Sequence, residues 1–245
     1  MTRILLLGGT LEARAMARAL ADAGIDAVYS YAGRVQNPAQ QPLPTRVGGF
    51  GGADGLAAYL RAEGFSHLID ATHPFAAAIS QNAHAAAGRA GVPLIVLERA
   101  PWASQPGDRW THVADFQAAA QVLPGDGSTV FLAIGRQQLA PFLGCKHRWM
   151  LRFAEVASHP LRDATLIVSR GPFSVAGDVA LMRRHGVTHV VTKNSGGRGA
   201  EAKLAAAREL GLPVIVIDRP ALPARHVVAS VAEVMDWLHG ADRGE

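Results

Sequence analysis

The sequence predicts an α/β protein with two Rossmann-like, doubly wound parallel-sheet domains that face a central cleft. Short apolar runs alternate with helical patterns along the chain, and most runs end in a polar turn that contains glycine. A change of composition at residues 98–109 separates two such series. Continuous apolar runs are typical of strands buried on both faces of a parallel sheet. We therefore expect the polar turns to mark the ligand-binding edge of each sheet.

The first predicted element is a strand at residues 4–7, which is followed by the adjacent glycines Gly8 and Gly9. Thr10 is a suitable N-cap for the next helix, which extends to Gly24. Glycine at this point lets a phosphate group approach the backbone, and the helix N-terminus supplies N–H donors and a positive dipole end. The spacing differs from the usual G-x-G-x-x-G pattern, so these residues alone fit a nucleotide site or a plain tight turn equally well.

The second strand, at residues 27–30, ends in Ser30 and is followed by Gly33 and Arg34. An NAD site usually has Asp or Glu at this position, where it binds the ribose 2′-hydroxyl. A hydroxyl and a guanidinium suit a 2′-phosphate instead, because arginine binds phosphate oxygens in a bidentate manner. The sequence therefore favours an NADP site here over a surface arginine without a function.

Two irregular segments precede the third buried strand. Residues 36–44 are rich in Gln and Pro and predict a loop. Residues 48–52 contain four glycines, a pattern that fits a hinged lid or a slack connection equally well. A helix is predicted after them at residues 56–63.

The strand predicted at residues 67–71 leads into the string D-A-T-H-P-F, which begins at Asp70. An alanine-rich helix follows at residues 76–88. Thr72 lies near its N-terminus, where a hydroxyl can bond the backbone or a ligand phosphate. His73 is placed either to stack on a nicotinamide or substrate ring or to bond the loop backbone, and Asp70 is interpreted as structural.

A strand at residues 94–97 ends the first series. We predict a cofactor-binding domain at residues 1–103 and a substrate-binding domain at residues 104–245. The second series has the same order of strand, polar turn and helix. Further strands are predicted at 110–113, 129–134, 149–153, 165–169, 189–192 and 214–217, and further helices at 115–123, 175–184, 200–210 and 231–238, with a short helix opening at Gly135.

Composition excludes several classes of protein. Of the 245 residues, 49% are apolar and 18% are charged, as in ordinary globular proteins. No apolar run approaches the roughly 18 residues of a membrane-spanning helix. The chain enters a strand at once, so we expect no signal peptide and a cytoplasmic location. The single Cys145 excludes an internal disulfide and a Cys-rich metal site, and no metal is expected.

The net charge of +4 fits a nucleic-acid partner or a polyanionic small molecule equally well, and charge alone does not decide between them. The arginines are scattered, without a basic run interleaved with aromatic residues, so a polyanionic small molecule is expected rather than a nucleic acid.

Five motifs, in this order, resemble the precorrin-6A reductase family: G-G-T-x-E from Gly8, D-A-T-H-P-F from Asp70, G-R from Gly135, R-G-P-F from Arg170 and K-N-S-G-G from Lys193. The resemblance implies NADPH-dependent reduction of one C=C bond of the precorrin-6A macrocycle to give precorrin-6B, a step of cobalamin biosynthesis.

The expected site residues fall into two groups. The cofactor-binding group comprises Gly8, Gly9, Thr10, Leu11, Ser30, Gly33, Arg34, Thr72 and His73. The substrate-binding group, which the resemblance places opposite, comprises Arg136, Arg170, Gly171, Lys193, Asn194, Ser195 and Gly196. His73 is the candidate catalytic residue, although catalysis is expected to depend mainly on positioning and electrostatics.

The carboxylates of a tetrapyrrole require charge-assisted partners, which Arg and Lys supply best. Six cationic residues stand at predicted strand ends: Arg99, Arg136, Arg170, Lys193, Arg198 and Arg219.

Other readings are a short-chain dehydrogenase, a nucleotide-sugar glycosyltransferase and an NADP-sensing regulatory protein. The first lacks its Tyr-x-x-x-Lys pair, because no tyrosine in this chain has Lys four residues later. Nucleotide binding and turnover distinguish the other two.

Overall fold

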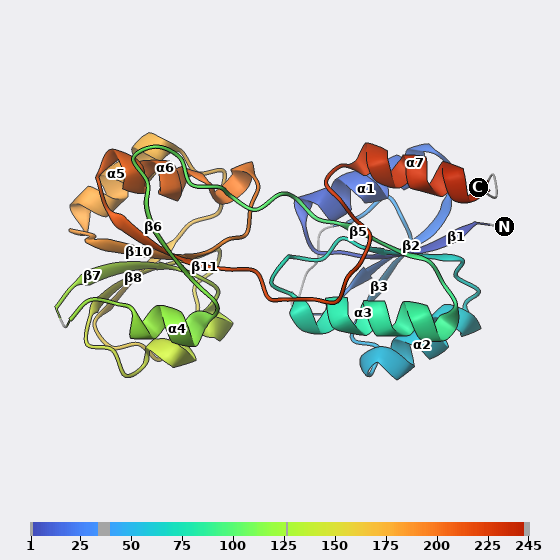
Figure 1. Ribbon diagram of the computed structural model, residues 1–245, viewed down its shortest axis with the longest axis horizontal. Helices are drawn as coiled ribbons and strands as arrows, with labels where there is room; N and C mark the ends of the chain where they lie inside the picture. Colours follow the sequence, from blue (N-terminus) through green and yellow to red (C-terminus); the bar gives the residue numbers. More distant parts are fainter. Residues whose placement is uncertain (1, 34–39, 126, 243–245) are drawn as a thin grey trace. The chain divides into compact units, whose positions relative to one another are not determined.

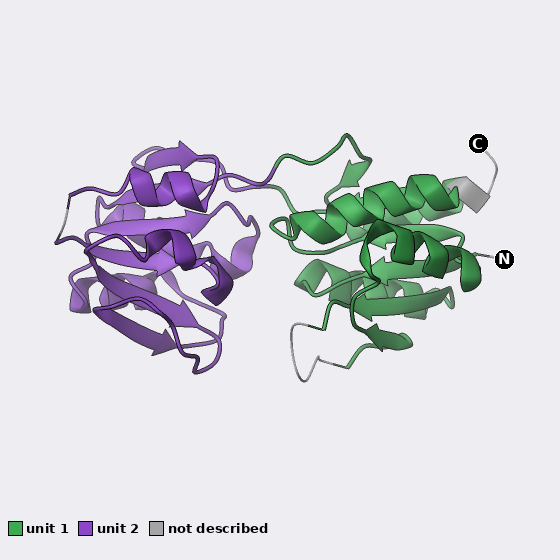
Figure 2. Ribbon diagram, turned by 90° about the horizontal axis from the view of Figure 1, so that it is seen from below, with its two compact units in different colours: residues 1–100, 221–245 green, residues 101–220 purple. Residues whose placement is uncertain are grey.

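The computed structural model describes residues 2–33, 40–125 and 127–242. The chain divides into two compact units, shown in Figure 2. Unit 1 consists of Met1–Ala100 and Ala221–Glu245, and unit 2 is the continuous segment Pro101–Pro220. Each unit contains one six-stranded sheet in which every strand pair is parallel, which confirms the predicted α/β class.

The sheet of unit 1 has the strand order β12-β5-β4-β1-β2-β3. Read from β3, this is the doubly wound Rossmann order, and it reverses direction between β1 and β4. Helices α1 (Leu11–Asp22) and α7 (Val231–Asp242) cover one face, while α2 (Gly52–Ala62) and α3 (Ala77–Ala90) cover the other (Figure 1). The strands are β1 (Arg3–Leu7), β2 (Asp26–Tyr31), β3 (Thr45–Val47), β4 (His67–Asp70), β5 (Leu94–Leu97) and β12 (Val227–Val228).

The central strand β1 shows why the chain forms two layers of helix. Ile4 and Leu6 belong to the core cluster beneath α1 and α7, whereas Leu5 and Leu7 belong to the cluster beneath α2 and α3. All four side chains are buried, because successive residues of a strand point to opposite faces and both faces are covered. The continuous apolar run in the sequence is the direct consequence.

The sheet of unit 2 has the order β6-β11-β10-β7-β8-β9. Helices α5 (Val175–Arg184) and α6 (Ala202–Glu209) lie on one face and α4 (Phe116–Gln121) on the other (Figure 1). The strands are β6 (Arg109–Val113), β7 (Thr129–Ala133), β8 (Arg148–Phe153), β9 (Ala164–Val168), β10 (His189–Lys193) and β11 (Pro213–Ile217), and single 3₁₀ turns occur at Arg136–Gln138, Ala140–Phe142 and Arg198–Ala200.

The last segment of the chain corrects the predicted domain limits. The expected division after residue 103 lies close to the observed one, but residues 221–245, expected in the second domain, belong to unit 1. Strand β12 pairs with β5, with Val227 opposite Val96. Val234 and Leu238 of α7 are buried in the core beneath α1. The amphipathic pattern of a helix predicts that the helix packs on a sheet, but it does not indicate which of the two sheets.

Two short strands, β3 and β12, were missing from the prediction. Both are edge strands of three residues or fewer, too short to produce an apolar run.

Candidate functional site

The turn after β1 is fixed by close packing against Tyr29. A Cβ atom at Gly8 would lie 2.1 Å from Cζ of this buried tyrosine, so only glycine fits. Gly9 has φ of +128° and donates its N–H to the Tyr29 hydroxyl at 2.8 Å. Burial raises the pKa of Tyr29 to about 12, so the phenol stays neutral at physiological pH. The turn is therefore rigid before any ligand binds.

Thr10 joins this turn to the neighbouring strand β4 at the point where the strand order reverses. Its hydroxyl accepts the N–H of Ala13 at 3.0 Å, which caps α1 as predicted, and donates to the carbonyl of Ala71 at 2.8 Å. Leu11, the next residue, is 67% exposed, so the first turn of α1 faces solvent. Ligands bind at such reversal points in open α/β sheets, and Thr10 shapes this one through its cap and its bond to Ala71.

The D-A-T-H-P-F segment forms a compact turn after β4. The buried Asp70 accepts both the N–H of Thr72, at 3.0 Å, and its hydroxyl, at 2.7 Å. His73 Nδ1 accepts the N–H of Phe75 at 3.1 Å, so the ring proton lies on Nε2. Asp70 therefore has a structural role in this turn, and the His73 ring is oriented by the loop backbone. Its catalytic role stays a prediction.

The β2–β3 edge contains a residue that the sequence prediction missed. Arg46 lies directly opposite Ser30 in the parallel register, and its Nη1 donates to the Ser30 hydroxyl at 2.8 Å. Arg34, the expected phosphate ligand, lies outside the described residues. The signal that could have identified Arg46 is an arginine placed just before a glycine-rich string at the end of an extended segment.

In unit 2, a cavity of about 330 Å³ lies at the carboxyl ends of β7, β8 and β9. Two of the predicted substrate residues, Arg170 and Gly171, line it. Three cationic side chains, Arg152, Arg170 and Lys203, contribute to its wall together with Phe173. A cavity with this charge suits a carboxylate group.

Arg152 is the cation of this cavity that is fixed both by a buried ion pair and by a ring contact. Its Nη1 lies 2.5 Å from Oδ1 of Asp178, and both side chains are buried. The guanidinium stacks on Phe173, 3.7 Å from the ring centroid. Arg170, in contrast, is exposed and pairs with Glu155 at 2.5 Å. The two arginines therefore differ in burial, although each pairs with a carboxylate.

Lys203 is a buried lysine within α6 that the sequence prediction did not select. Its residue is 4% exposed, and Nζ donates to the Ala200 carbonyl at 2.5 Å and lies 4.6 Å from the Trp102 ring centroid. Burial, and next the charge of Arg152, lower the pKa of Lys203 to about 7. An alanine-rich helix in the sequence gave no sign that its lysine points inward.

The K-N-S-G-G turn at the end of β10 is held by hydrogen bonds to Trp102 and Arg219, which lie in other segments. Asn194 accepts the N–H of Trp102 at 2.7 Å and donates to the Trp102 carbonyl at 3.1 Å. Arg219 donates to the carbonyls of Asn194 and Ser195, at 3.0 and 3.3 Å. Both polar atoms of the Asn194 side chain thus fix a neighbouring loop. Lys193, Ser195 and Gly196 follow the same strand end, and the exposed Arg136 follows β7. Their substrate roles stay predictions.

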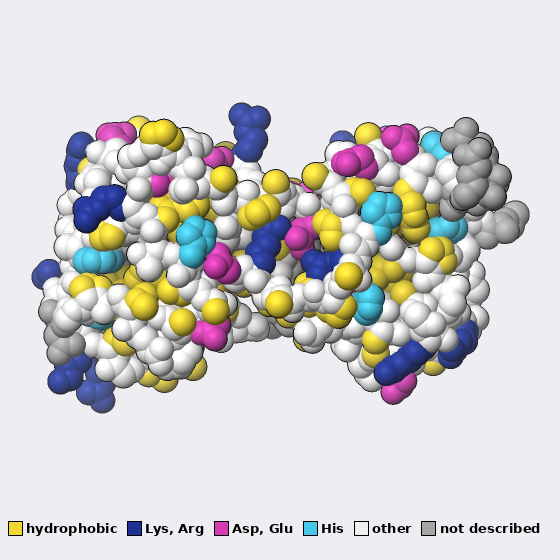
Figure 3. Space-filling model, in the orientation of Figure 1, with side chains coloured by type: hydrophobic (Ala, Val, Ile, Leu, Met, Phe, Trp, Pro, Cys, Tyr) yellow, Lys and Arg dark blue, Asp and Glu magenta, His cyan; other side chains and the backbone are white. Residues whose placement is uncertain are grey.

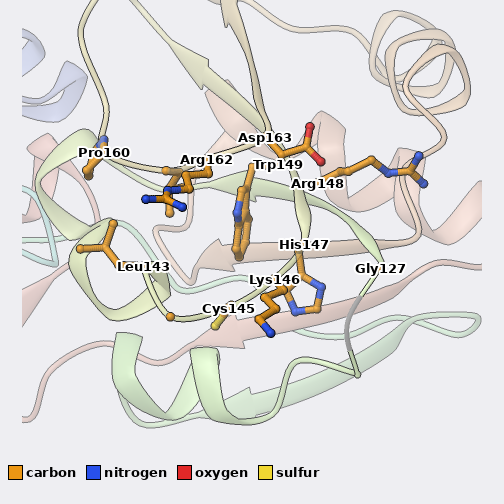
Figure 4. A pocket seen from close by; sticks show the side chains of 12 residues that line it. Gly127, Leu143, Cys145, Lys146, His147, Arg148, Trp149, Pro160, Arg162 and Asp163 are labelled. Atoms are coloured by element: carbon orange, nitrogen blue, oxygen red, sulfur yellow. The ribbon is translucent and has the colours of Figure 1, made fainter.

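A larger cavity of about 970 Å³ lies at the opposite, amino-terminal edge of the same sheet (Figure 4). Its lining includes His147, Arg148, Trp149 and Arg162 and contains none of the predicted site residues. We place the functional site at the carboxyl edge despite the difference in size, because the strand-end turns and the buried cations gather there.

Charged side chains are dispersed on the face drawn in Figure 3. Figure 3 shows Lys and Arg side chains scattered over the visible face of each unit, with Asp and Glu among them. Within the described ranges, no helix combines the length and apolar character needed to cross a bilayer. No cluster of three or more His, Cys, Asp or Glu side chains in those same ranges has the geometry to hold a metal ion.

The strand order and the glycine turns at the carboxyl edges define a Rossmann-type protein, a class whose members bind nucleotide cofactors at this edge. Residues 3–239 match the model of the family described as Precorrin-6x reductase CbiJ/CobK. The chain belongs to this family, which confirms the resemblance indicated by the five motifs.

Individual relatives agree with the family match. The chain is 57% identical to a precorrin-6A reductase of Rhodobacter capsulatus, over 98% of both chains. It is 51% identical to the corresponding protein of Rhodococcus erythropolis, over 97% of this chain and 98% of that one. A cobalt-precorrin-6A reductase of Priestia megaterium is 31% identical over 96% and 97%. The solved structure named CobK precorrin-6A reductase superimposes with a TM-score of 0.91 at 57% identity, covering 98% of this chain and 97% of that one.

Proposed function

We propose that this protein is a precorrin-6A reductase that transfers a hydride from NADPH to one C=C bond of the precorrin-6A macrocycle, giving precorrin-6B in cobalamin biosynthesis. The observation that carries the proposal is similarity along the whole chain. The reductase family covers residues 3–239, and a relative bearing that name is 57% identical over 98% of both chains.

Unit 1 is the proposed cofactor side. The space beside Gly9 is open, since a Cβ atom there would meet no atom within 4 Å, and α1 presents its N-terminus next to it. At the end of β2, where an NAD site has an acidic residue, this chain has the hydroxyl of Ser30 bonded to a guanidinium. These groups fit a dinucleotide with a 2′-phosphate. When bound, the nicotinamide of such a cofactor supplies the hydride.

Unit 2 is the proposed substrate side. The cavity bounded by Arg152, Arg170 and Lys203, of about 330 Å³, is too small for a whole macrocycle but has room for a carboxylate-bearing side chain at its edge. We assign it to one acetate or propionate group of the substrate. The predicted residues Arg136, Lys193, Ser195 and Gly196 are proposed to contact the rest of the rim.

The proposed catalytic contribution of the protein is chiefly orientation. Hydride transfer needs the acceptor carbon about 3 to 3.5 Å from the donor carbon, and reduction of a C=C bond also needs one proton. The His73 ring, fixed by the Phe75 amide, carries a proton on Nε2 and is the candidate group beside the nicotinamide. The conjugated macrocycle itself delocalises charge, so a strong acid is not required.

The proposal is tested by titrating the purified protein with NADPH, NADH and a uridine diphosphate sugar, followed by anaerobic turnover of precorrin-6A monitored by absorbance. We expect binding of NADPH in preference to NADH, no binding of the sugar nucleotide, and consumption of one NADPH per macrocycle. Binding of NADPH without turnover would favour the regulatory reading, and binding of neither nicotinamide nucleotide would refute the reductase. A cytoplasmic location and the absence of a nucleic-acid partner remain predictions from the sequence.

A further inference from the structure

We propose that Arg46 is a ligand of the 2′-phosphate of NADPH and therefore a residue that determines the choice between NADPH and NADH. The inference rests on the proposed function, because it assumes that a dinucleotide binds to unit 1. It concerns a residue on β3, an element that the sequence analysis did not predict.

The position of Arg46 is set by strand pairing. In the parallel register of β2 and β3, Ser30 is opposite Arg46, and Ser30 is the penultimate residue of β2. The end of the second strand of a Rossmann sheet is where the adenosine ribose is recognised. The backbone thus brings the Arg46 side chain to the place where a 2′-phosphate would be bound.

The guanidinium is held in one orientation before any ligand binds. Its Nη1 donates to the Ser30 hydroxyl at 2.8 Å and to the Gly48 carbonyl at 2.9 Å, and Nη2 donates to the Gly49 carbonyl at 3.2 Å. One face of the group lies on the Phe50 ring, 3.9 Å from its centroid. A preorganised arginine loses little side-chain freedom when it binds an anion.

These contacts explain the glycine-rich segment. Gly48 has φ of +126°, a conformation that favours glycine, and the carbonyls of Gly48 and Gly49 both accept from Arg46. The Gly48 N–H is in turn bonded to the Tyr31 carbonyl at 2.9 Å. This part of the segment thus forms a cradle for the guanidinium, while the choice between a hinged lid and a slack connection stays open.

The cradle leaves both charge and donors unused. Three of the five guanidinium N–H groups are accounted for by the contacts above. Nε and the second N–H of Nη2 donate to no acceptor among the residues that the structure describes. Among the described residues, no carboxylate forms an ion pair with Arg46, and the atoms that accept from it are neutral hydroxyl and carbonyl oxygens. A half-buried, positively charged fork of this kind matches a phosphate dianion.

The deciding experiment compares Arg46→Ala and Arg46→Lys with wild type in titrations with NADPH, NADH, 2′,5′-ADP and 5′-AMP. We expect Arg46→Ala to weaken NADPH and 2′,5′-ADP by about 10- to 100-fold, the range for one or two charge-assisted bonds. NADH and 5′-AMP, which lack the 2′-phosphate, should change by less than about 2-fold. Arg46→Lys keeps the charge but loses the planar fork, and should fall in between.

Arg61→Ala is the matched control. Arg61 is an exposed arginine of the same unit, in the last turn of α2, and it donates to the carbonyl of Arg89. Its removal should leave all four affinities unchanged.

The outcomes separate the two proposals. An equal loss for ligands with and without the 2′-phosphate, or an unchanged NADPH preference in both Arg46 variants, overturns the role of Arg46 and leaves the reductase intact. If wild type binds neither nicotinamide nucleotide, the proposed function itself fails. Should Arg46→Ala not fold, as judged by thermal unfolding, Arg46→Lys and Arg46→Gln decide the question by the same ratio of affinities.

Discussion

Lys203→Met should change how the stability of unit 2 depends on pH. The lysine is buried in α6, and burial lowers its pKa from 10.5 to about 7. Between these two values the unfolded chain binds a proton that the folded chain does not, so stability of the wild type rises with pH in this window. Below about pH 7 both states are protonated, and the cost of burying the charge is fully present.

The size of the effect follows from the two pKa values. One pH unit corresponds to 1.36 kcal/mol, so the window from about 7 to 10.5 amounts to roughly 5 kcal/mol in the free energy of unfolding. About 3 kcal/mol of this should appear between pH 6.5 and 9.5. Methionine has a similar length and no charge. The stability advantage of Lys203→Met over wild type should therefore be greatest at low pH and shrink as pH rises.

Urea unfolding followed by tryptophan fluorescence measures this difference. Three of the four tryptophans, Trp102, Trp110 and Trp149, lie in unit 2 and report on it. Lys146→Met, which removes an exposed ammonium of the same unit, is the control and should follow wild type. Parallel stability curves for wild type and Lys203→Met across this pH range would refute the reasoning, because they would mean that Lys203 stays charged or becomes solvated in the folded protein.

Three further substitutions test packing and polar contacts. Gly8→Ala places a Cβ atom 2.1 Å from Cζ of the buried Tyr29, so thermal unfolding should show a loss of about 1–3 kcal/mol or more; a wild-type melting temperature would contradict the rigid turn. Asp178→Ala leaves the buried Arg152 without its partner and should lower the free energy of unfolding, measured in urea, by about 3–5 kcal/mol. The double variant Asp178→Ala/Arg152→Met should recover most of this stability. No recovery in the double variant would count against the pairing. Asn194→Asp removes the donor to the Trp102 carbonyl and should destabilise unit 2 by about 1–3 kcal/mol; if only substrate affinity changed, the side chain would be a ligand and not a loop anchor.

The strongest sequence signals were those with a local physical cause. The apolar run at Ile4–Leu7 and the Thr10 cap follow directly from burial on two faces and from an unsatisfied helix N-terminus, and the structure contains both. The turns at strand ends were found for the same reason, since their glycines and polar residues interrupt apolar runs. These signals were enough to predict both sheets and the turns at their carboxyl edges, whereas the role of those turns as a site stays a prediction.

What the sequence did not reveal depends on contacts between distant residues. Arg46 faces Ser30 because a three-residue strand pairs with β2, and such a strand leaves no pattern. Lys203 is buried because α5, α6 and the Trp102 loop enclose it, whereas its alanine-rich neighbours suit either face of a helix. The bonds of the Asn194 side chain to Trp102, 92 residues away in sequence, left no sign in the sequence, while its predicted substrate contact stays a prediction.

The return of the last segment of the chain to unit 1 sets an order for folding during synthesis. Domains generally fold as units as the chain emerges from the ribosome. Unit 2 is continuous and can fold once residue 220 has emerged, whereas unit 1 still lacks β12 and α7 at that time. Its strand β5 and the apolar face beneath α7 stay uncovered until β12 and α7 have been made. Open strand edges promote association between chains. The half of the protein that is made first is therefore the half that is finished last.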